Sequence, residues 1–458
     1  MPFMMRTVST RHNRIHRTIP FRPSIYKPND YTYHAQCGFN TIGAYLNRHK
    51  PQRLPEYDPS LFANDRILRD IIRKPTKWTH EQYIDSMDRP EKRRVYTEAS
   101  RMVRDEGRVI SRITPFTKLE KVKTDKYRAP RLIHSRHATF NIEYGSYIKP
   151  LERSLKPDKH FGKGTYDQIA AKIAGLASKY KYYTAGDHSS FDAHNLREHL
   201  QLCHRFYAKC YDNDKYLRKL SRRTLRNKCS TRHGESYILD GGRMSGDVDT
   251  GFGNCIVNLY ILRSVLSDLG YKGDAIVNGD DFILFSTARI DIARFGERLR
   301  SYNMECKLVD SATNISTVEF CRTKLVYHPD GHPTMAFDPD RLKAIYGCTF
   351  HRYSDSNYLR YLQNVQHANW SINQNSPVHR QWRPLDRPRV SILEKDRLHV
   401  LKKQSTNRPY TWDYLTPSFI EAYPNYQIDK PLVPIYKQPP DQCAFYIFNH
   451  MSKLVTYI

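Results

Sequence analysis

The spacing of apolar residues predicts helices in the first part of the chain. Between residues 60 and 112, apolar positions recur at helical intervals and many charged residues face outward. The next stretch, 113–152, is basic, is bounded by prolines and contains strand-like pieces. Ile169, Ile173 and Leu176 then repeat at the interval of one helix face, so we expect a helix between about 165 and 180.

The period changes to that of strands in the middle of the chain. A strand is expected at 182–185, a strongly basic helical segment follows over 195–228, and 235–350 alternates strand, helix and hairpin patterns. Beyond residue 351 the sequence is rich in Tyr, Pro and Arg, with one helix expected near 358–365. The pattern predicts a fold that mixes helices with strands.

Two short apolar runs within 275–285 flank Asn278-Gly279, which is a strong signal for a β-hairpin. Asp280 and Asp281 come next, so the hairpin is expected to hold two adjacent carboxylates in a cleft. Such acids repel each other unless a cation lies between them. The alternative is a plain surface hairpin in which the acids serve only the turn.

A second acidic position follows another strand. The strand that begins at Tyr182 is expected to end at Gly186, which places Asp187 at its carboxyl end, where open sheets commonly carry functional groups. Phosphoryl transfer with two metal ions needs carboxylates from at least two strands, and Asp187 and Asp280 are the obvious pair. The alternative for Asp187 is a helix N-cap.

A flexible Ser-Gly loop at 245–246 precedes a long, largely apolar helix that we expect to end near residue 270. Thr250, Asn254 and Asn258 fall at i, i+4 and i+8 and form one polar stripe on that helix. Buried polar groups need partners. Bonds to neighbouring backbone are the favoured interpretation for Asn258, and less so for Thr250 and Asn254.

Composition narrows the class of partner. The chain has 458 residues, enough for about three domains, and 74 Lys and Arg against 47 Asp and Glu give a formal net charge of +27. This excess points to a polyanion, either nucleic acid or an anionic membrane surface. Residues 1–29 contain no acid and are expected to form a mobile basic arm.

The cysteine spacing and the hydropathy argue against several classes of protein. The nine cysteines form no CxxC pair, which argues against a zinc ribbon or a redox motif and indicates a reducing compartment. The first 22 residues have no apolar core of the kind found in secretory signals. No apolar run approaches the ~20 residues that span a bilayer.

In this order and spacing, the three acidic and polar segments resemble motifs A, B and C of the palm of viral RNA-dependent RNA polymerases. The motifs appear as D-x4-D from Asp187 to Asp192, SG-x3-T-x3-N from Ser245 to Asn254, and GDD at 279–281. Further segments resemble the tombusvirus-like (carmovirus-like) branch. Its basic motif F is similar to residues 118–121, 129–136 and 147–152. Its motif B is similar to residues 243–247, and its motif E to residues 319–321.

The resemblance implies template-directed RNA synthesis from NTPs on a positive-strand viral genome. In that reaction two Mg²⁺ ions, for which Mn²⁺ can substitute, are held by Asp187 and Asp280, with Asp281 as a secondary ligand. Lys307 is expected to be the general acid that protonates pyrophosphate, and a plain surface lysine is the equal alternative there.

The resemblance also implies the residues that bind the nucleotide. Lys121, Arg131 and Arg136 are expected to grip the triphosphate, because guanidinium forks and ammonium groups suit phosphate; a solvated basic face is the alternative. Asp192 is expected to accept a hydrogen bond from the ribose 2′-hydroxyl, and Asn254 to donate one. The other expected substrate-binding residues are Ser245, Gly246 and Thr250.

The implied fold is α+β, a right-hand polymerase with fingers, palm and thumb, in which an antiparallel palm sheet is backed by helices. The expected parts are a basic mobile arm at 1–30, an N-terminal extension and fingers at 31–183, palm with motif A at 184–198, a fingers insertion at 199–235, palm with motifs B to E at 236–345, and thumb with the C-terminal region at 346–458.

Template RNA, the nascent strand and NTPs are the expected partners. The family's larger polymerases carry an upstream membrane-targeting portion and the sequence has no transmembrane segment, so a separate membrane-anchoring replicase protein is a further expected partner. The implied location is the host cytoplasm, at membrane-bound replication complexes reached through that partner.

Two other functions are consistent with part of the sequence. A non-enzymatic RNA-binding or capsid protein explains the charge and the basic arm but leaves Asp187, Asp280 and the 245–254 motif unexplained. A reverse transcriptase gives no reason to keep Asp192 and Asn254 together, and it typically carries a different motif at 279–281.

Overall fold

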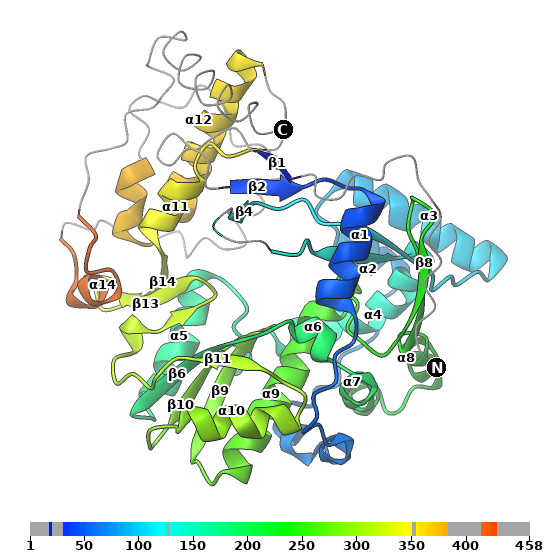
Figure 1. The fold of residues 1–458 in the computed structure, drawn as a ribbon, viewed down its shortest axis with the longest axis horizontal. Helices are drawn as coiled ribbons and strands as arrows, with labels where there is room; N and C mark the ends of the chain where they lie inside the picture. Colours follow the sequence, from blue (N-terminus) through cyan, green and yellow to red (C-terminus); the bar gives the residue numbers. More distant parts are fainter. Residues whose placement is uncertain are drawn as a thin grey trace.

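The computed structural model describes residues 18–20, 31–123, 125, 128–349, 354–382 and 414–427. Helices and mainly antiparallel sheets make up this part of the chain (Figure 1). The fold is therefore α+β, as the family resemblance implies, and it mixes helices with strands, as the sequence pattern predicts.

A four-stranded antiparallel sheet lies at the centre of the fold, with the strand order β11–β6–β10–β9. Ile276 and Ile283 pack on one face with the apolar side of α5, whereas Val277 and Leu284 pack on the other face with α9 and α10. This alternation places helices on both faces of the sheet (Figure 1). The elements are β6 (Tyr182–His188), β9 (Gly273–Asn278), β10 (Asp281–Ser286), β11 (Cys306–Leu308), α5 (Tyr166–Ala177), α9 (Thr250–Asp268) and α10 (Ile292–Ser301).

A second sheet, with the order β5–β3–β7–β8, brings together strands from two separate parts of the chain. Its strands are β3 (Ile113–Thr117), β5 (Leu132–Arg136), β7 (Arg226–Ser230) and β8 (Ser236–Asp240). The helices of this region are α2 (His80–Asp85), α3 (Pro90–Glu106), α4 (Ala138–Leu155), α6 (Phe191–His194), α7 (Arg197–Cys210) and α8 (Lys215–Arg222).

Two smaller sheets belong to the two ends of the described chain. The first comprises β1 (Thr18–Pro20), β2 (Tyr31–His34) and β4 (Val122–Lys123), and is followed along the chain by α1 (Gly38–Ala44) and the π-helical turn η1 (Tyr45–His49). The second comprises β12 (Glu319–Phe320), β13 (Thr323–Tyr327) and β14 (Pro333–Phe337), and precedes α11 (Pro339–Ile345), α12 (Asp355–Ile372) and α14 (Pro417–Ala422). Short 3-10 turns are η2 (Pro59–Phe62), η3 (Arg66–Ile71), η4 (Ile315–Thr317) and η5 (Pro377–Trp382).

The strand-like pieces expected over 113–152 are present in its first half as β3, β4 and β5, whereas helix α4 occupies the second half. Its residues are buried along nearly the whole length, so no polar face marks the helical period. The helix also contains Pro150, and Gly145 sits where a side-chain carbon would lie 2.3 Å from the Tyr83 ring. Because this helix is buried on all sides, its sequence lacks the alternation of polar and apolar positions that would predict it.

Several local predictions hold with shifted ends. The helix expected over 165–180 is α5, and the helix expected near 358–365 lies within α12. The central hairpin turns at Gly279 and Asp280, one residue later than predicted, because Asn278 pairs with Asp281. The basic segment 195–228 divides into two helices and the start of a strand.

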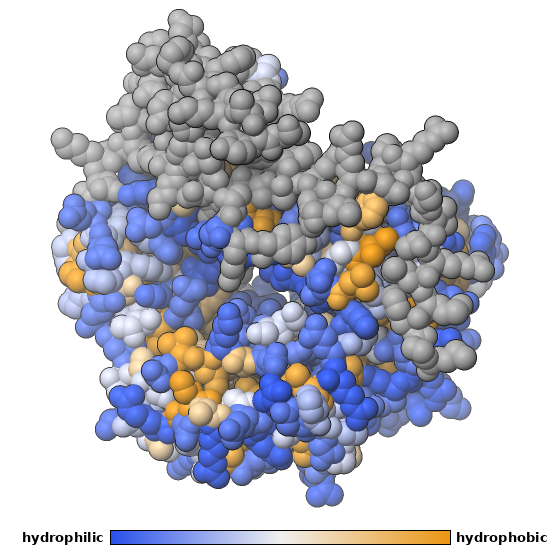
Figure 2. Space-filling view, in the orientation of Figure 1, coloured by the Kyte–Doolittle hydropathy of each residue, from blue (hydrophilic) through white to orange (hydrophobic). Residues whose placement is uncertain are grey.

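Much of the predicted basic arm and of the C-terminal region lies outside the described residues. Within the arm the structure describes only Thr18–Pro20, as a strand paired with β2. No helix in the described ranges is long and apolar enough to cross a membrane. Most of the face drawn in Figure 2 is hydrophilic, with an apolar patch over the region of β6 and β11.

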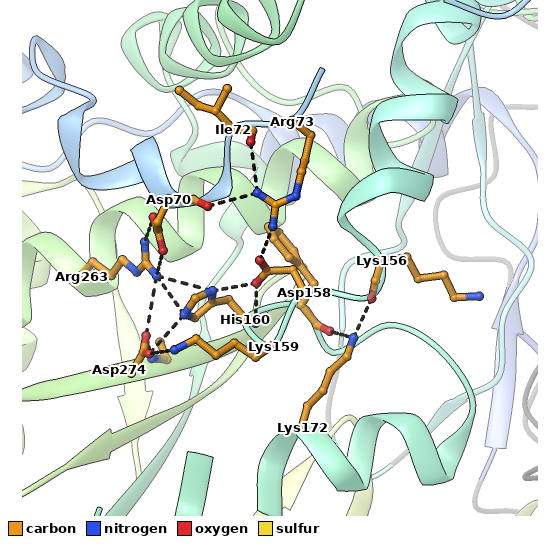
Figure 3. Close-up of polar contacts among 12 residues, drawn as sticks. Asp70, Ile72, Arg73, Lys156, Asp158, Lys159, His160, Lys172, Arg263 and Asp274 are labelled. Carbon is orange, nitrogen blue, oxygen red and sulfur yellow. Dashed lines mark hydrogen bonds and ion pairs between the residues drawn. The ribbon is translucent and has the colours of Figure 1, made fainter. Parts of the chain in front are cut away.

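A buried polar cluster behind the central sheet joins the N-terminal segment to the sheet (Figure 3). The Nδ1 atom of His160 lies 2.7 Å from an Asp158 carboxylate oxygen, and its Nε2 atom lies 3.1 Å from a carboxylate oxygen of Asp274 on β9. Arg73 donates to Asp158, and Arg263 of α9 contacts the imidazole. These bonds hold the N-terminal segment, α9 and β9 in one arrangement.

Candidate active site

Three acidic residues lie at one end of the central sheet. Strands β6 and β10 are neighbours whose register pairs Asp187 with Asp281, and Asp280 occupies the turn before β10. Gly186 permits this approach, because a side-chain carbon there would lie 2.2 Å from the Phe282 ring. Asp187 and Asp280 line one pocket of about 290 Å³. The structure thus brings together the two acids that the sequence analysis pairs.

These carboxylates destabilise each other's charged forms. Burial and the neighbouring Asp280 raise the pKa of Asp187, while Lys307 and Arg131 act in the opposite direction. Burial, followed by the charges of Asp280 and Asp187, raises the pKa of Asp281 to about 6. Lys307 is exposed on β11 and is paired in register with Asp187. A cation placed among these acids would relieve their repulsion.

Asn258 and His188 fix the turn that carries Asp280. The Asn258 side-chain amide donates to the carbonyl oxygens of Gly279 and Asp280, at 2.9 and 3.3 Å. Its oxygen lies 3.0 Å from Nε2 of His188, and burial lowers the pKa of that imidazole to about 4. A neutral His188 therefore donates to Asn258. The backbone partners favoured for Asn258 from the sequence are confirmed.

Asp192 is the centre of a second polar network in the same pocket. The Asn254 side-chain nitrogen donates to one carboxylate oxygen of Asp192 at 2.8 Å, and the Ser245 hydroxyl donates to the other. All three residues line the pocket with Asp187 and Asp280. The Asn254 side-chain oxygen is buried and has no hydrogen-bond partner among the described residues.

Positive side chains also line the pocket. Arg48, Lys118 and Arg131 line it, and Glu120 lies 3.3 Å from Arg131 and 3.4 Å from Lys118. Burial, followed by the charge of Arg131, lowers the pKa of Arg48, whereas Glu120, Asp192 and Asp280 act in the opposite direction. An anion bound beside these cations would favour their charged forms.

Two of the predicted phosphate ligands lie elsewhere. Arg136 is buried and forms an ion pair with Asp247 at 2.7 Å, and it donates a further bond to Asn227. Lys121 is exposed, and its ammonium group lies 3.4 Å from the carbonyl oxygen of Ile345. Neither side chain lines the pocket that holds Asp187.

Thr250 and Gly246 shape the loop before α9 without lining the pocket. The Thr250 hydroxyl donates to the carbonyl oxygen of Met244 at 2.7 Å and accepts from the backbone nitrogen of Gly246 at 3.2 Å. Gly246 has a φ of +133°, and a side-chain carbon there would lie 3.0 Å from the carbonyl oxygen of His134. Thr250 therefore bonds backbone, the interpretation that the sequence analysis favours less.

Comparison with known proteins identifies the family. The family model described as "Viral RNA dependent RNA polymerase" matches residues 48–385, which include every residue of the site. The chain belongs to this family. Curated relatives named RNA-directed RNA polymerase come from oat chlorotic stunt virus, with 29% identity over 69% of this chain, and from tomato bushy stunt virus, with 31% identity over 48%.

These relatives confirm the predicted tombusvirus-like branch, and a third, from turnip crinkle virus, is 29% identical over 61% of this chain. The matched regions cover 44%, 29% and 38% of the three viral polymerases, respectively. The chain thus spans less than half the length of the curated relatives it matches.

Sequence analysis missed two basic residues of the pocket. Lys118 lies in the predicted basic region, but the sequence motifs predict no contact with substrate for it. Arg48 lies about 70 residues earlier in the chain, on η1. Only the tertiary fold brings η1 to the pocket. The local sequence Asn47-Arg48-His49-Lys50 is basic, which is too common a pattern to single out Arg48.

Proposed function

We propose that this chain contains the catalytic region of an RNA-directed RNA polymerase that copies a positive-strand viral RNA genome from NTPs. One observation carries the proposal: a single pocket is lined by Asp187 and Asp280, by Arg131, and by Asp192 with its hydrogen-bond donor Asn254. Such a pocket offers separate sites for a metal-bound phosphate, the remaining phosphates and a ribose.

The carboxylate donors suit Mg²⁺. No group of three Asp, Glu, His or Cys side chains in the described ranges is arranged to hold a metal ion by itself. Mg²⁺ commonly takes one or two carboxylates and completes its shell with water and substrate phosphate oxygens. Asp187 and Asp280 would hold two such ions, with Asp281 as a secondary ligand; Mn²⁺ could substitute. Bound ions activate the attacking 3′-hydroxyl and neutralise charge on the leaving pyrophosphate.

Arg131, Arg48 and Lys118 bind the triphosphate in this proposal. Guanidinium groups donate paired hydrogen bonds to phosphate oxygens, and the ammonium adds a point charge. Arg136 instead holds the loop before α9 through Asp247. Lys121 stays a predicted contact to phosphate, as it is exposed and bears no ion pair among the described residues.

The Asp192 network selects the sugar. The Asn254 nitrogen gives one of its two hydrogens to Asp192, so the second can donate to a ribose 2′-hydroxyl while Asp192 accepts from it, which are the roles expected from the sequence. Ser245 holds the other oxygen of Asp192. A 2′-deoxyribose would leave Asp192 and Asn254 without this hydrogen-bond partner, which opposes dNTP binding.

Lys307 is proposed as the proton donor to pyrophosphate. It is exposed and its strand pairs with that of Asp187, so its flexible ammonium can reach groups bound beside the acids. Its charge also favours the ionised form of Asp187.

We propose the right-hand arrangement of fingers, palm and thumb, with the boundaries given above. The central sheet is the palm, and the contact of Lys121 with Ile345 supports N-terminal fingers that reach toward the region after the palm. A membrane-anchoring replicase partner and replication complexes at host cytoplasmic membranes are proposed from the family alone.

An incorporation assay tests the function. The purified chain, a defined RNA template, labelled NTPs and Mg²⁺ should yield RNA complementary to the template, and product should depend on both template and metal. A chain that binds RNA but incorporates no nucleotide with either Mg²⁺ or Mn²⁺ would contradict the proposal. A product made from dNTPs in preference to NTPs would indicate a reverse transcriptase instead.

A further inference from the structure

The turn between β12 and β13 has an unfavourable backbone conformation. Phe320 pairs with Thr323, so Cys321 and Arg322 form a two-residue turn. Their φ angles are +51° and +63°, and turns of this kind favour glycine and asparagine, because other side chains rarely adopt a positive φ. Residues held in such regions cluster at functional sites. The contacts of this turn show what its conformation achieves.

Apolar packing holds the turn beside the β9–β10 hairpin. Phe320 of β12 lies in the same apolar cluster as Ile276 of β9 and Ile283 of β10. The sheet of β12, β13 and β14 therefore packs on the side of the central sheet that α5 covers, and Figure 1 shows β13 and β14 next to α5. Cys321 directly follows Phe320, so its side chain reaches the end of the hairpin that carries the acids.

The Cys321 thiol bridges the two residues at the base of the catalytic turn. Asn278 and Asp281 pair across the hairpin, on either side of Gly279 and Asp280. The Asn278 side-chain nitrogen donates to the Cys321 sulfur at 3.1 Å. The thiol also forms a hydrogen bond with the Asp281 carboxylate, and burial, followed by the charge of that carboxylate, raises the pKa of Cys321 to about 12. The protonated thiol is therefore the donor in this bond.

Other groups fix the backbone of the same turn. The amide nitrogen of Gly279 donates to the Cys255 sulfur at 3.1 Å. The Asn258 side chain binds the carbonyl oxygens of Gly279 and Asp280. Bonds to the backbone do not fix the torsion angles of the Asp281 side chain, so the orientation of its carboxylate depends on a contact of its own.

We propose that Cys321 is a positioning residue for the metal site, and that its thiol fixes the orientation of the Asp281 carboxylate beside Asp187 and Asp280. This role rests on the proposed polymerase function, in which Asp281 is a secondary ligand. Hydrogen-bond partners of metal ligands orient those ligands, and their loss commonly weakens metal affinity or activity ten- to a hundredfold. A small side chain that only fills space would explain neither the bond from Asn278 nor the positive φ.

Binding of Mn²⁺ to the purified full chain tests the role without catalysis. The free-ion electron paramagnetic resonance signal is titrated in the absence of nucleotide and RNA. Cys321→Ala should weaken Mn²⁺ binding by about tenfold. Cys321→Ser should bind nearly as tightly as the wild type, because its hydroxyl can also donate and accept. The control Cys210→Ala removes a buried thiol of α7 and should match the wild type.

Incorporation kinetics provide a second readout. On a primed RNA template, Cys321→Ala should lower kcat by about tenfold with an unchanged KM for NTPs, and added Mg²⁺ should partly restore the rate. Cys321→Gly removes the thiol and also relieves the positive φ, so it should melt no lower than Cys321→Ala and show the same losses. A purely structural loss would lower the melting temperature and would not respond to Mg²⁺.

The outcomes separate this inference from the proposed function. If the wild type is active, yet Cys321→Ala and Cys321→Gly match Cys210→Ala in kcat and in metal dependence, the positioning role is wrong and the polymerase proposal stands. Failure of serine to restore function would also overturn the role of the hydrogen bond. If the wild type incorporates no nucleotide but Cys321→Ala still weakens Mn²⁺ binding, the polymerase proposal is wrong and the positioning role stands. A wild type that neither binds Mn²⁺ nor incorporates nucleotide would refute both.

Discussion

Two arginines five positions apart show how burial decides the role of a residue. Arg131 is 44% exposed and lines the pocket, whereas the Arg136 side chain is fully buried against Asp247. In sequence both belong to one basic segment, and no local pattern distinguishes them. Their different environments lead to opposite predictions for the same substitution.

We expect Arg136→Gln to lower the free energy of unfolding by about 3–5 kcal/mol, because Asp247 would be left buried without its counter-charge. Arg131→Gln should change it by no more than about 0.5 kcal/mol and should instead raise the KM for NTPs. Chemical unfolding and steady-state kinetics of both variants measure the two effects. A stable Arg136→Gln protein with a raised KM for NTPs would contradict this structural role and would indicate that Arg136 binds the triphosphate.

Sugar selection provides a second residue-scale prediction. The wild type should favour NTPs over dNTPs by ~10⁴, and Asn254→Ala should reduce that ratio by about ten- to a hundredfold, since only the ribose loses a hydrogen-bond partner. Asn258→Ala serves as the comparison, because it disturbs the turn at Asp280 and should slow both substrates alike. An unchanged ratio in Asn254→Ala would refute the sugar contact.

At the scale of elements, the sequence predicts a helix best where one of its faces is polar, and a hairpin best where turn residues mark it. Helix α5 and the central hairpin follow from such signals. Helix α4 does not, because it is buried on all sides. The register of β6 against β10, which pairs Asp187 with Asp281, depends on contacts between residues almost 100 positions apart. No local pattern contains that information.

The His160 cluster links elements in a pH-dependent manner. Bonds to Asp158 and Asp274 raise the pKa of His160 despite its burial. A raised pKa stabilises the fold fully below the unfolded-state value of about 6.5, and this contribution is lost as pH rises through the higher folded-state value. Both aspartates have lowered pKa values, so their contribution is lost only in acid.

We therefore expect His160→Gln to lower the free energy of unfolding by about 1–3 kcal/mol below pH 6.5, by removing a charged donor to two buried acids. The difference from the wild type should shrink as pH rises above neutrality. Urea unfolding between pH 6 and 9 measures it. A difference that grows with pH would show that His160 acts as a neutral group.

At the scale of the whole molecule, the net charge and the order of the motifs indicate the class of enzyme. The full set of residues that line the pocket could be identified only from the tertiary fold. Asp187, Asp192, Asn254 and Asp280 were recognisable from local motifs. The contribution of Arg48 depends on bringing η1 beside β5, which no spacing in the sequence reveals.

The net charge of +27 predicts binding dominated by the phosphate backbone. If about six phosphates are contacted, RNA affinity should fall by ~10³ between 50 and 200 mM salt, with little dependence on sequence. Titrations with RNAs of unrelated sequence at several salt concentrations measure this. A flat salt dependence would mean that the charge serves another surface, such as an anionic membrane.

The central claim is that Asp187 and Asp280 support nucleotide transfer, and single-nucleotide incorporation by Asp280→Asn tests it most directly. The substitution keeps the shape of the side chain and removes its charge. Asp105→Asn, at an exposed position of α3, is the control. With Mg²⁺ and a primed RNA template, Asp280→Asn should incorporate at least roughly 10³-fold more slowly than the wild type, while it still binds RNA and Asp105→Asn stays fully active. Incorporation by Asp280→Asn at a rate near that of Asp105→Asn would contradict the account.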